Sequence, residues 1–263
     1  MQSGINALVE WSVKWMLAFN GDKCNMLHLG KNNPKLSYTI KDGDITKTLN
    51  ETTSEKDLGV IVDSQLNFDE HITSVIKKSR KISGMLMKNI CHKSKEIMIP
   101  LYKATVRPHL EYANAVWAPY KRKDIDKLEK VQRQFTKKIN GLKDYDYQTR
   151  LYKLKLPSLE FRRVRGDLIE AYKLTHNIYD PLTTSSLLQL SSNTKTKGHS
   201  YKLQKKRVNT KKYQFFFTNR IINLWNKLPE DVVSADSINT FKNKVDVFLK
   251  EYTYQINLDI FKM

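Results

Sequence analysis

Cysteine and long apolar runs are both scarce in this sequence. Its 263 residues contain two cysteines, Cys24 and Cys91, which lie far apart and in no CxxC spacing. This pattern excludes a disulfide framework and a cysteine-based zinc site, and it favours a reducing compartment. No run approaches the roughly 20 apolar residues that span a bilayer. The first residues also lack the basic start and apolar block of a secretory signal.

Recognisable catalytic motifs are absent as well. The six histidines are scattered singly, without an HExxH or a spaced Cys/His cluster, and no glycine-rich phosphate loop is present. Cys91 and His92 are expected to be a core cysteine beside a surface histidine. A two-metal site needs carboxylates that converge on ions about 4 Å apart. Turn geometry and helix dipoles favour structural roles instead for the three Asp-x-Asp steps, which are Asp42/Asp44, Asp124/Asp126 and Asp144/Asp146.

Acidic residues are missing from one long segment. Between Thr183 and Pro229 there is no Asp or Glu, within a chain whose formal net charge is +19. Such a concentrated cationic excess predicts salt-dependent binding to a polyanion. Nucleic acid is the favoured partner, and an anionic membrane surface is second because the segment has no clean amphipathic period. The cations of this segment are Lys195, Lys197, Lys202, Lys205, Lys206, Arg207, Lys211, Lys212, Arg220 and Lys227.

The first seventy residues predict one helix and a small β element. Apolar residues recur at helical steps from Ser3 to Phe19, so we expect a helix that Ser3 caps and Asn20-Gly21 ends. A short strand is expected in KCNMLHLG, and Asp42-Gly43 between two β-prone arms predicts a hairpin. A further strand is expected in EKDLGVIVD. This part is too small to fold well alone.

From Phe68 onward the apolar period is helical, so the fold class predicted for the chain is α+β. A helix is expected from about Ser94 to Val106, with Pro108 marking its end or a kink. Another is expected from Leu159 to Leu174, capped by Ser158. The Thr/Ser/Asn-rich stretch 183–200 predicts a linker or surface loop, and a last helix is expected over 238–249.

The clearest predicted helix runs from Asp124 to Ile139. Its surroundings, Lys121 to Lys143, contain nine Lys and Arg against three Asp and Glu, a net charge of +6. A helix of this kind suits a phosphate backbone, which it binds by shape and charge without reading bases. The alternative is a solvated face held by i,i+4 pairs such as Asp126–Lys130 and Glu129–Arg133. The charge periodicity favours neither of these two interpretations clearly. Trp117 and Tyr120 lie just before this helix and could stack on bases, although buried packing is favoured for Trp117.

Five blocks of the sequence, taken in order, resemble the C-terminal half of the reverse transcriptase of non-LTR retrotransposons of the jockey-like and chicken-repeat-like kind. The blocks cover nearly the whole chain. They are INALVEWSVKWMLAFNGDKCNMLHLGKNN, EKDLGVIVDSQLNF, LYKATVRPHLEYANAVWAPYKRKDIDKLEKVQRQFTKKINGL, YQTRLYKLKLPSLEFRRVRGDLIEAYKL and FFFTNRIINLWNKLPEDVVSADSINTFKNKVDVFL.

The resemblance implies a layout in four parts. Residues 1–67 correspond to the end of the palm, a small antiparallel β remnant with one helix. Residues 68–182 correspond to a helical thumb, which grips the template–primer duplex, 183–213 to a basic linker and 214–263 to a C-terminal helical region that contacts element RNA or target DNA. Glu55–Asp63 resembles the hairpin that positions the primer strand, so the resemblance gives that role to Leu58, Gly59 and Val60.

The departures from the family concern catalysis. The family's catalytic carboxylates lie in an aromatic-Ala-Asp-Asp turn just before the helix that begins this chain, and no Asp-Asp pair occurs in this sequence. The fingers, the front of the palm, the endonuclease domain and a terminal zinc knuckle have no counterpart either. Asp57 stands where many relatives have an aromatic residue in the primer-positioning strand. Met1 is therefore expected to be a start codon within a longer frame or the first residue of a truncated gene.

Three hypotheses follow. The leading one is a truncated reverse transcriptase fragment, inactive alone and without a catalytic residue, metal or cofactor, that retains affinity for RNA, an RNA–DNA hybrid or DNA. The second is the rear half of an active RNA-directed DNA polymerase, for which Mg²⁺ is expected only in the full-length enzyme; the third is a decayed product without function. An intracellular and, from access to chromosomal DNA, nuclear location is expected, with no membrane association. The candidate phosphate contacts are Lys127, Lys130, Arg133, Lys137 and Lys138 in the thumb and Lys205, Lys206, Arg207, Lys211 and Lys212 in the tail.

Overall fold

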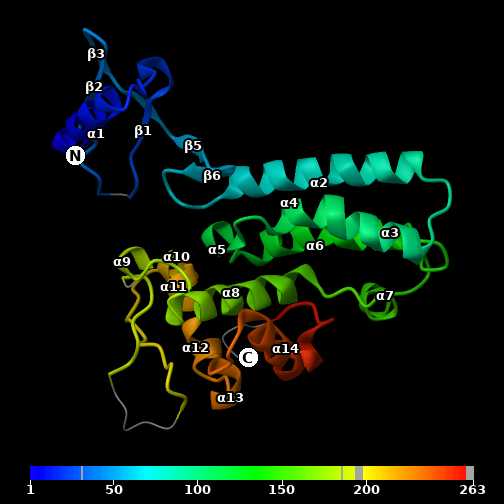
Figure 1. Cartoon of the computed structure of the whole chain (residues 1–263). Helices are drawn as coiled ribbons and strands as arrows, with labels where there is room; N and C mark the ends of the chain where they lie inside the picture. Colours follow the sequence, from blue (N-terminus) through cyan, green and yellow to red (C-terminus); the bar gives the residue numbers. More distant parts are fainter. Residues whose placement is uncertain (31, 185, 193–197, 259–263) are drawn as a thin grey trace. The chain divides into compact units, whose positions relative to one another are not determined.

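The protein is described by a computed structural model that covers residues 1–30, 32–184, 186–192 and 198–258. The chain divides into two compact units, Met1–Thr73 and Ser74–Met263. The first unit mixes helices and strand pairs, whereas the regular elements of the second are helices, as Figure 1 shows for each. The mixed α and β character expected from the sequence is therefore confirmed, while the four-part layout remains a prediction.

The N-terminal unit contains three two-stranded pairs. β1 (Asn25–Leu27) pairs in parallel with β4 (Asn50–Thr52), so this part of the β element is not antiparallel as expected. The other two pairs are antiparallel hairpins, β2 (Thr39–Asp42) with β3 (Ile45–Thr48) and β5 (Ser54–Asp57) with β6 (Val60–Asp63). The hairpin expected near Asp42-Gly43 is confirmed, and the single strand expected in EKDLGVIVD is instead the β5–β6 hairpin that the family resemblance implied.

The first helix, α1 (Gln2–Lys14), ends five residues earlier than expected. Met16 takes the left-handed conformation, with φ 55°, and terminates it without a glycine. The expected cap is also wrong, because Met1 occupies the N-cap position and no side chain caps the helix there. Gly21 does not end the helix as expected. A Cβ at this position would lie 2.9 Å from the Lys47 side chain. Gly21 allows the short helix η1 (Gly21–Lys23) to approach the β2–β3 hairpin closely.

The helices of the C-terminal unit follow α2 (Asp69–Asn89), which begins in the N-terminal unit. In chain order they are α3 (Lys95–Leu101), a π-turn η2 (Tyr102–Val106), α4 (Arg107–Glu111), α5 (Asn114–Trp117), α6 (Arg122–Lys137), α7 (Tyr147–Leu154), α8 (Leu159–Thr175), α9 (Pro181–Thr184), α10 (Lys211–Gln214), α11 (Phe217–Arg220), α12 (Ile222–Trp225), α13 (Glu230–Val233), α14 (Ile238–Phe248) and a final 3-10 turn η3 (Lys250–Tyr252). α8 contacts both α6 and α14 and lies between them in Figure 1.

Pro108 produces a local widening of the helix rather than its end. A proline inside a helix removes one amide donor and crowds the carbonyl four residues earlier. The chain adjusts by forming the π-turn η2 immediately before it, where the Arg107 amide donates to the Tyr102 carbonyl. The helical path consequently continues through α4 to Glu111, beyond the end expected at Val106.

The C-terminal helices and α8 share one hydrophobic core. Phe161, Val164, Leu168 and Tyr172 of α8 are buried in it. The side chains that meet them include Ile221, Trp225, Phe241 and Val245, of which Trp225, Phe241 and Val245 are completely buried. Burying a large apolar side chain is worth about 1.5–3 kcal/mol relative to exposure. This core therefore fixes the orientation of α8, against which α6 packs.

Part of the predicted linker is attached to this core. Leu190 and Leu203 form an isolated antiparallel bridge, and Leu203 is buried in the shared core. The Ser191 amide donates to the Lys202 carbonyl at 2.7 Å beside this bridge. Lys195 and Lys197 lie outside the described residues.

Candidate nucleic-acid interface

Helix α6 separates its charges by face. Leu128, Val131, Phe135 and, just after the helix, Ile139 are buried, as the sequence period predicted. The candidate cations of the helix all lie in exposed positions, and they are Lys127, Lys130, Arg133, Lys137 and Lys138.

The acidic residues of α6 do not form the i,i+4 ion pairs with these cations that a solvated helix face would require. Asp126 pairs with Arg122, at 2.7 Å, rather than with Lys130. Glu129 points inward and is 1% exposed, so it does not pair with Arg133. Neither of the two pairs named for that alternative is present among the described residues. From Lys127 to Lys138 the exposed surface of α6 carries cations and no carboxylate.

The five cations differ in how strongly the protein holds them. Lys127 donates to Asp124 at 2.9 Å, and the Arg133 guanidinium lies 5.0 Å from the centre of the Tyr147 ring. Lys130, Lys137 and Lys138 form no ion pair within the described part of the chain. These three are consequently the side chains most available to an external anion.

A buried polar network holds the inner face of α6. Tyr102 donates to Gln132 at 2.7 Å, Gln132 donates to Tyr147 at 3.1 Å, and Tyr147 donates to Glu129. Glu129 also accepts from the Leu159 amide at the start of α8, at 3.2 Å. Burial raises the pKa of Glu129 and that of Tyr147. The network ties α6 to its neighbours and keeps its cationic face turned outward.

The C-terminal end of α6 is closed by an arginine that the sequence did not single out. Arg150, which is 4% exposed, donates to the Arg133 carbonyl and to the Thr136 hydroxyl, both at 3.2 Å. A cation at this end stabilises the helix through its dipole. Arg150 belongs to no basic cluster and to no recognisable motif in the sequence. Only the structure reveals this role.

The tail cations lie partly on irregular chain and partly on α10. Lys205, Lys206 and Arg207 are exposed after Leu203, and Lys211 and Lys212 are exposed in the first turn of α10. Three residues later Phe215 stacks on Tyr120, with ring centroids 5.2 Å apart, just before α6 begins. The tail is thereby anchored beside the first turn of α6.

Arg220, in contrast, does not belong to the exposed cationic surface of the acid-free segment. Its guanidinium donates to both carboxylate oxygens of Asp167 at 2.8 Å, and both residues are buried. Trp117 is 1% exposed and donates to the Tyr112 carbonyl, which confirms the packing role favoured for it. Tyr120 is only partly buried.

Of the residues to which the family resemblance gives a primer-positioning role, Leu58 and Gly59 form the β5–β6 turn and Val60 begins β6. Leu58 and Gly59 connect Asp57 to Val60 with φ of 43° and 88°, and Leu58 is 84% exposed whereas Val60 is 5% exposed. These backbone angles are typical of a two-residue hairpin turn with positive φ at both central positions.

One carboxylate in each of two Asp-x-Asp steps has a structural role. Asp42 accepts from Lys47 at 2.9 Å, and this hydrogen bond lowers its pKa. Asp146 caps α7 by accepting from the Thr149 amide. The residues that the structure describes contain no cluster of three or more His, Cys, Asp or Glu suited to a metal ion. Cys91, expected in the core, is exposed, because the chain leaves α2 at Asn89 and no helix face is there to bury it.

Comparisons with known proteins find relatives that match about half of this chain. The RNA-directed DNA polymerase from the mobile element jockey of Drosophila funebris is 32% identical over 148 residues, which is 54% of this chain and 15% of that protein. The chain is a homologue of retrotransposon polymerases. A second relative, the probable RNA-directed DNA polymerase from transposon X-element of Drosophila melanogaster, is 24% identical over 57% of this chain and 17% of its own length. The resemblance predicted from the motifs is thus confirmed over about half of the chain.

This chain spans about a sixth of the length of these jockey and X-element polymerases. No family model matches the sequence, and no solved structure matches the fold. No helix in the described ranges is both long and apolar enough to cross a membrane.

Proposed function

We propose that this homologue of jockey polymerases binds a nucleic-acid duplex through the exposed face of α6, as the thumb of a reverse transcriptase. The observation that carries the proposal is the separation of charge on α6, where cations are exposed from Lys127 to Lys138 and Glu129 is buried. A backbone-binding surface needs this arrangement because an exposed carboxylate would repel phosphates.

The geometry of the helix supports a contact with several phosphates. At 1.5 Å per residue the step from Lys127 to Lys138 is about 16 Å, and at 3.6 residues per turn the five cations fall within an arc of about 140°. Such a stripe can follow a strand of phosphates without reading bases. An RNA–DNA hybrid is the proposed ligand, because the relatives are named as RNA-directed DNA polymerases.

The proposal is tested by neutralising the three cations that form no ion pair. Lys130→Gln, Lys137→Gln and Lys138→Gln together are expected to weaken binding to an RNA–DNA hybrid and to reduce the slope of log K against log salt. Each lost phosphate contact contributes about 0.9 to that slope on duplex, so a reduction of about 2.7 is expected. Fluorescence anisotropy over a salt series measures both quantities.

A matched control removes the same charge elsewhere. Lys14, Lys23 and Lys41 are exposed in the N-terminal unit, and their triple change to Gln lowers the net charge equally. If the control triple and the α6 triple reduce the slope by the same amount, binding follows net charge alone and the α6 interface is wrong.

We further propose that the chain does not polymerise DNA by itself. Its sequence contains no Asp-Asp pair, and the residues described by the structure bring no metal-binding cluster of carboxylates together. Extension of a labelled primer on an RNA template with Mg²⁺ or Mn²⁺ tests this directly, and any template-dependent product would refute it.

The second candidate function is that of the rear part of a working polymerase. A specific observation favours it: α1 and the residues after it expose large apolar side chains, with Trp11 50%, Trp15 60% and Met16 94% exposed. Contiguous exposed apolar surface is typical of an interaction site. DNA synthesis on mixing this chain with the separately produced catalytic part of a jockey polymerase would support this function, and its loss with Trp11→Ser and Trp15→Ser would locate the contact.

A decayed product without function is the remaining hypothesis. It predicts poor solubility and no cooperative unfolding of the purified chain. A single sharp loss of helical signal in urea would exclude it, because such a transition requires a specifically packed core.

A further inference from the structure

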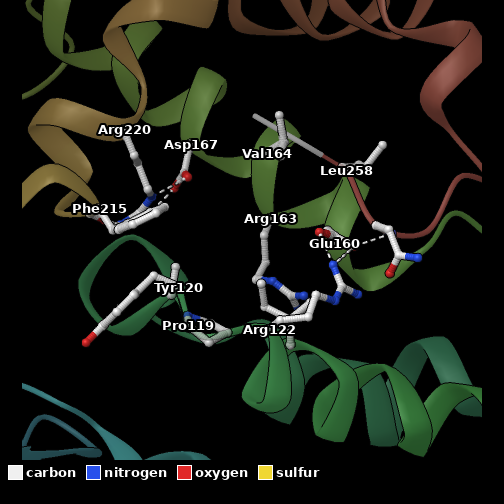
Figure 2. Close-up of a pocket in the computed structure, with 13 residues that line it drawn as sticks. Pro119, Tyr120, Arg122, Glu160, Arg163, Val164, Asp167, Phe215, Arg220 and Leu258 are labelled. Carbon is white, nitrogen blue, oxygen red and sulfur yellow. Dashed lines mark hydrogen bonds and ion pairs between the residues drawn. The ribbon is translucent and has the colours of Figure 1, made fainter. Parts of the chain in front are cut away.

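A pocket of about 280 Å³ lies where the loop before α6 meets α8 and the short helices α10 and α11. Figure 2 shows Tyr120, Arg122, Arg163 and Phe215 around it. Pro119, Tyr120 and Arg122 are only partly buried, so the pocket opens to solvent on their side. Its volume is close to the lower limit of typical small-ligand sites.

The two carboxylates of this pocket are already neutralised. Glu160 accepts from Arg122 at 3.0 Å and from the Asn257 amide at 3.0 Å. Asp167 accepts two hydrogen bonds from Arg220, as described above. Both pairs are drawn as dashed lines in Figure 2. Neither carboxylate therefore needs a further cation.

Arg163 is the remaining charged residue of the pocket, and its charge is not neutralised by a direct contact. It projects from α8 and is 6% exposed, yet its two terminal nitrogens form no hydrogen bond. A buried charge without a hydrogen-bonded partner is costly in a folded protein. Neighbouring carboxylates attract it without a hydrogen bond, and the strongest of these attractions comes from Glu129, whose buried Oε2 also has no hydrogen-bond partner. Among the residues that line the pocket, three arginines stand against two carboxylates, so an anion with a single charge is the complement of the lining.

The rest of the pocket is suited to a flat apolar group. Phe215 and Tyr120 both line it, and their rings stack on each other at 5.2 Å. Ala118, Val164 and Leu258 add aliphatic surface. Aromatic platforms of this kind stack on nucleobases regardless of base identity, because every base has a π-face. A base with its phosphodiester combines a flat body with one negative charge.

We propose that this pocket binds one nucleotide of a single-stranded nucleic acid, with its phosphodiester at Arg163 and its base against Tyr120 and Phe215. The inference rests on the proposed nucleic-acid function and adds a single-strand site to the duplex face of α6. Arg163 lines the pocket but its terminal nitrogens are buried, so the phosphodiester reaches them only after this side chain rotates toward the pocket. Arg122, the first residue of α6, lines the pocket, so a strand that is bound along α6 can continue into the pocket.

Arg163→Met tests the site because it replaces the guanidinium with an apolar chain of similar length, and its melting temperature is measured alongside because the variant also removes the charge that attracts Glu129. Binding of a fluorescent six-nucleotide single strand and of a blunt RNA–DNA hybrid are both measured by anisotropy. We expect Arg163→Met to weaken single-strand binding by about 10-fold or more, as expected for losing a charge-assisted contact, and to leave hybrid binding unchanged. Ala118→Leu, which fills the pocket and keeps every charge, is expected to weaken single-strand binding as well.

The outcomes separate this inference from the duplex proposal. Single-strand affinity that is unchanged by both variants overturns the pocket, even where the α6 triple still weakens hybrid binding. A lower melting temperature of Arg163→Met with unchanged single-strand affinity also overturns it, since Arg163 would then only balance Glu129. Absence of hybrid binding by the unmodified chain would instead overturn the proposed function.

Discussion

Two buried arginines, Arg163 on α8 and Arg220 at the end of α11, differ in what surrounds them. Arg220 donates to Asp167 and to the carbonyls of Phe215 and Ala115, the latter at 3.2 Å. It connects α11 to α8 and to the chain at α5, 105 residues away in sequence. Arg163 makes no such bonds through its terminal nitrogens. Residue type and burial are the same for both, so the partners alone distinguish a structural arginine from one available to a ligand.

Arg220→Ala is expected to lower the free energy of unfolding by about 3–5 kcal/mol, because it leaves the carboxylate of Asp167 buried without its partner. Urea unfolding followed by circular dichroism measures the loss. Arg207→Ala, an exposed arginine of the same basic segment, is the control and is expected to change stability by no more than about 0.5 kcal/mol. Equal effects of the two substitutions would contradict the structural role of Arg220.

His176 makes stability depend on pH. Its ring is stacked between Tyr172 and Tyr201, with centroid distances of 3.9 Å and 4.2 Å, and burial lowers its pKa from 6.5. Below pH 6.5 the unfolded chain binds the proton more readily than the folded protein does. The stability that neutral His176 contributes is therefore lost as the pH falls through that value toward the lowered pKa.

Replacing His176 by Phe keeps an aromatic ring in the stack and removes the titration. The stability of the His176→Phe variant relative to the unmodified protein is expected to rise as the pH falls below 6.5. Urea midpoints at several pH values between 5 and 8 measure the difference. A difference that is constant with pH would show that the His176 pKa is not lowered.

At the scale of the element, the β5–β6 turn illustrates a local conflict between sequence and conformation. Leu58 has φ 43°, which costs an ordinary residue about 1–2 kcal/mol, and a two-residue turn of this kind prefers Asn-Gly. Gly59, with φ 88°, satisfies the preference at the second position. A strained, exposed leucine at a hairpin tip is compatible with the primer contact that the family resemblance implies, because its side chain contributes little buried surface to the fold.

Leu58→Asn is consequently expected to stabilise the N-terminal unit by about 0.5–1 kcal/mol, since Asn adopts the left-handed conformation more readily. It is also expected to weaken hybrid binding if the leucine touches the primer. Thermal unfolding and anisotropy measure the two effects. Gly59→Ala is the opposite test and is expected to destabilise the same hairpin, because alanine disfavours φ 88°.

The elements differ in how well the sequence predicted them. α6 and α8 were predicted within two residues, because Ser158 caps α8 and the apolar period of α6 is continuous. The end of α1 was not predicted, since Met16 takes a conformation that its residue type disfavours. The sequence did not predict that Glu129 points inward. The helical period alone does not reveal that the Tyr147 hydroxyl donates a hydrogen bond to this carboxylate inside the protein.

At the scale of the whole molecule, the two units contrast in the size of their cores. Among the described residues of the N-terminal unit, the buried hydrophobic side chains are Ile40, Val60 and Ile72. The C-terminal unit contains two large buried groups, one around Leu128 and Phe135 and the other around Trp225. The sequence predicted the small size of the first unit from its short strands, but the joining of residues 159–175 and 217–249 in one core depends on contacts between distant segments.

Hydrogen exchange is expected to follow this contrast. Amides of β1 to β6 are expected to exchange faster than amides of α6, α8 and α14, because small cores open at a lower free energy. Exchange measured by mass spectrometry on peptides from each unit provides the comparison. Equal protection of strand and helix peptides would indicate that the chain unfolds as one cooperative body.

The core that α8 shares with the last helices has a genetic consequence. A nonsense mutation before Phe217 would remove Trp225 and Phe241 and leave the apolar face of α8, including Phe161 and Leu168, open to water. The product would retain every candidate cation of α6 and yet be prone to aggregation and degradation. A chain that lacks only its final fifty residues should therefore fail to fold stably, although it keeps the whole of α6.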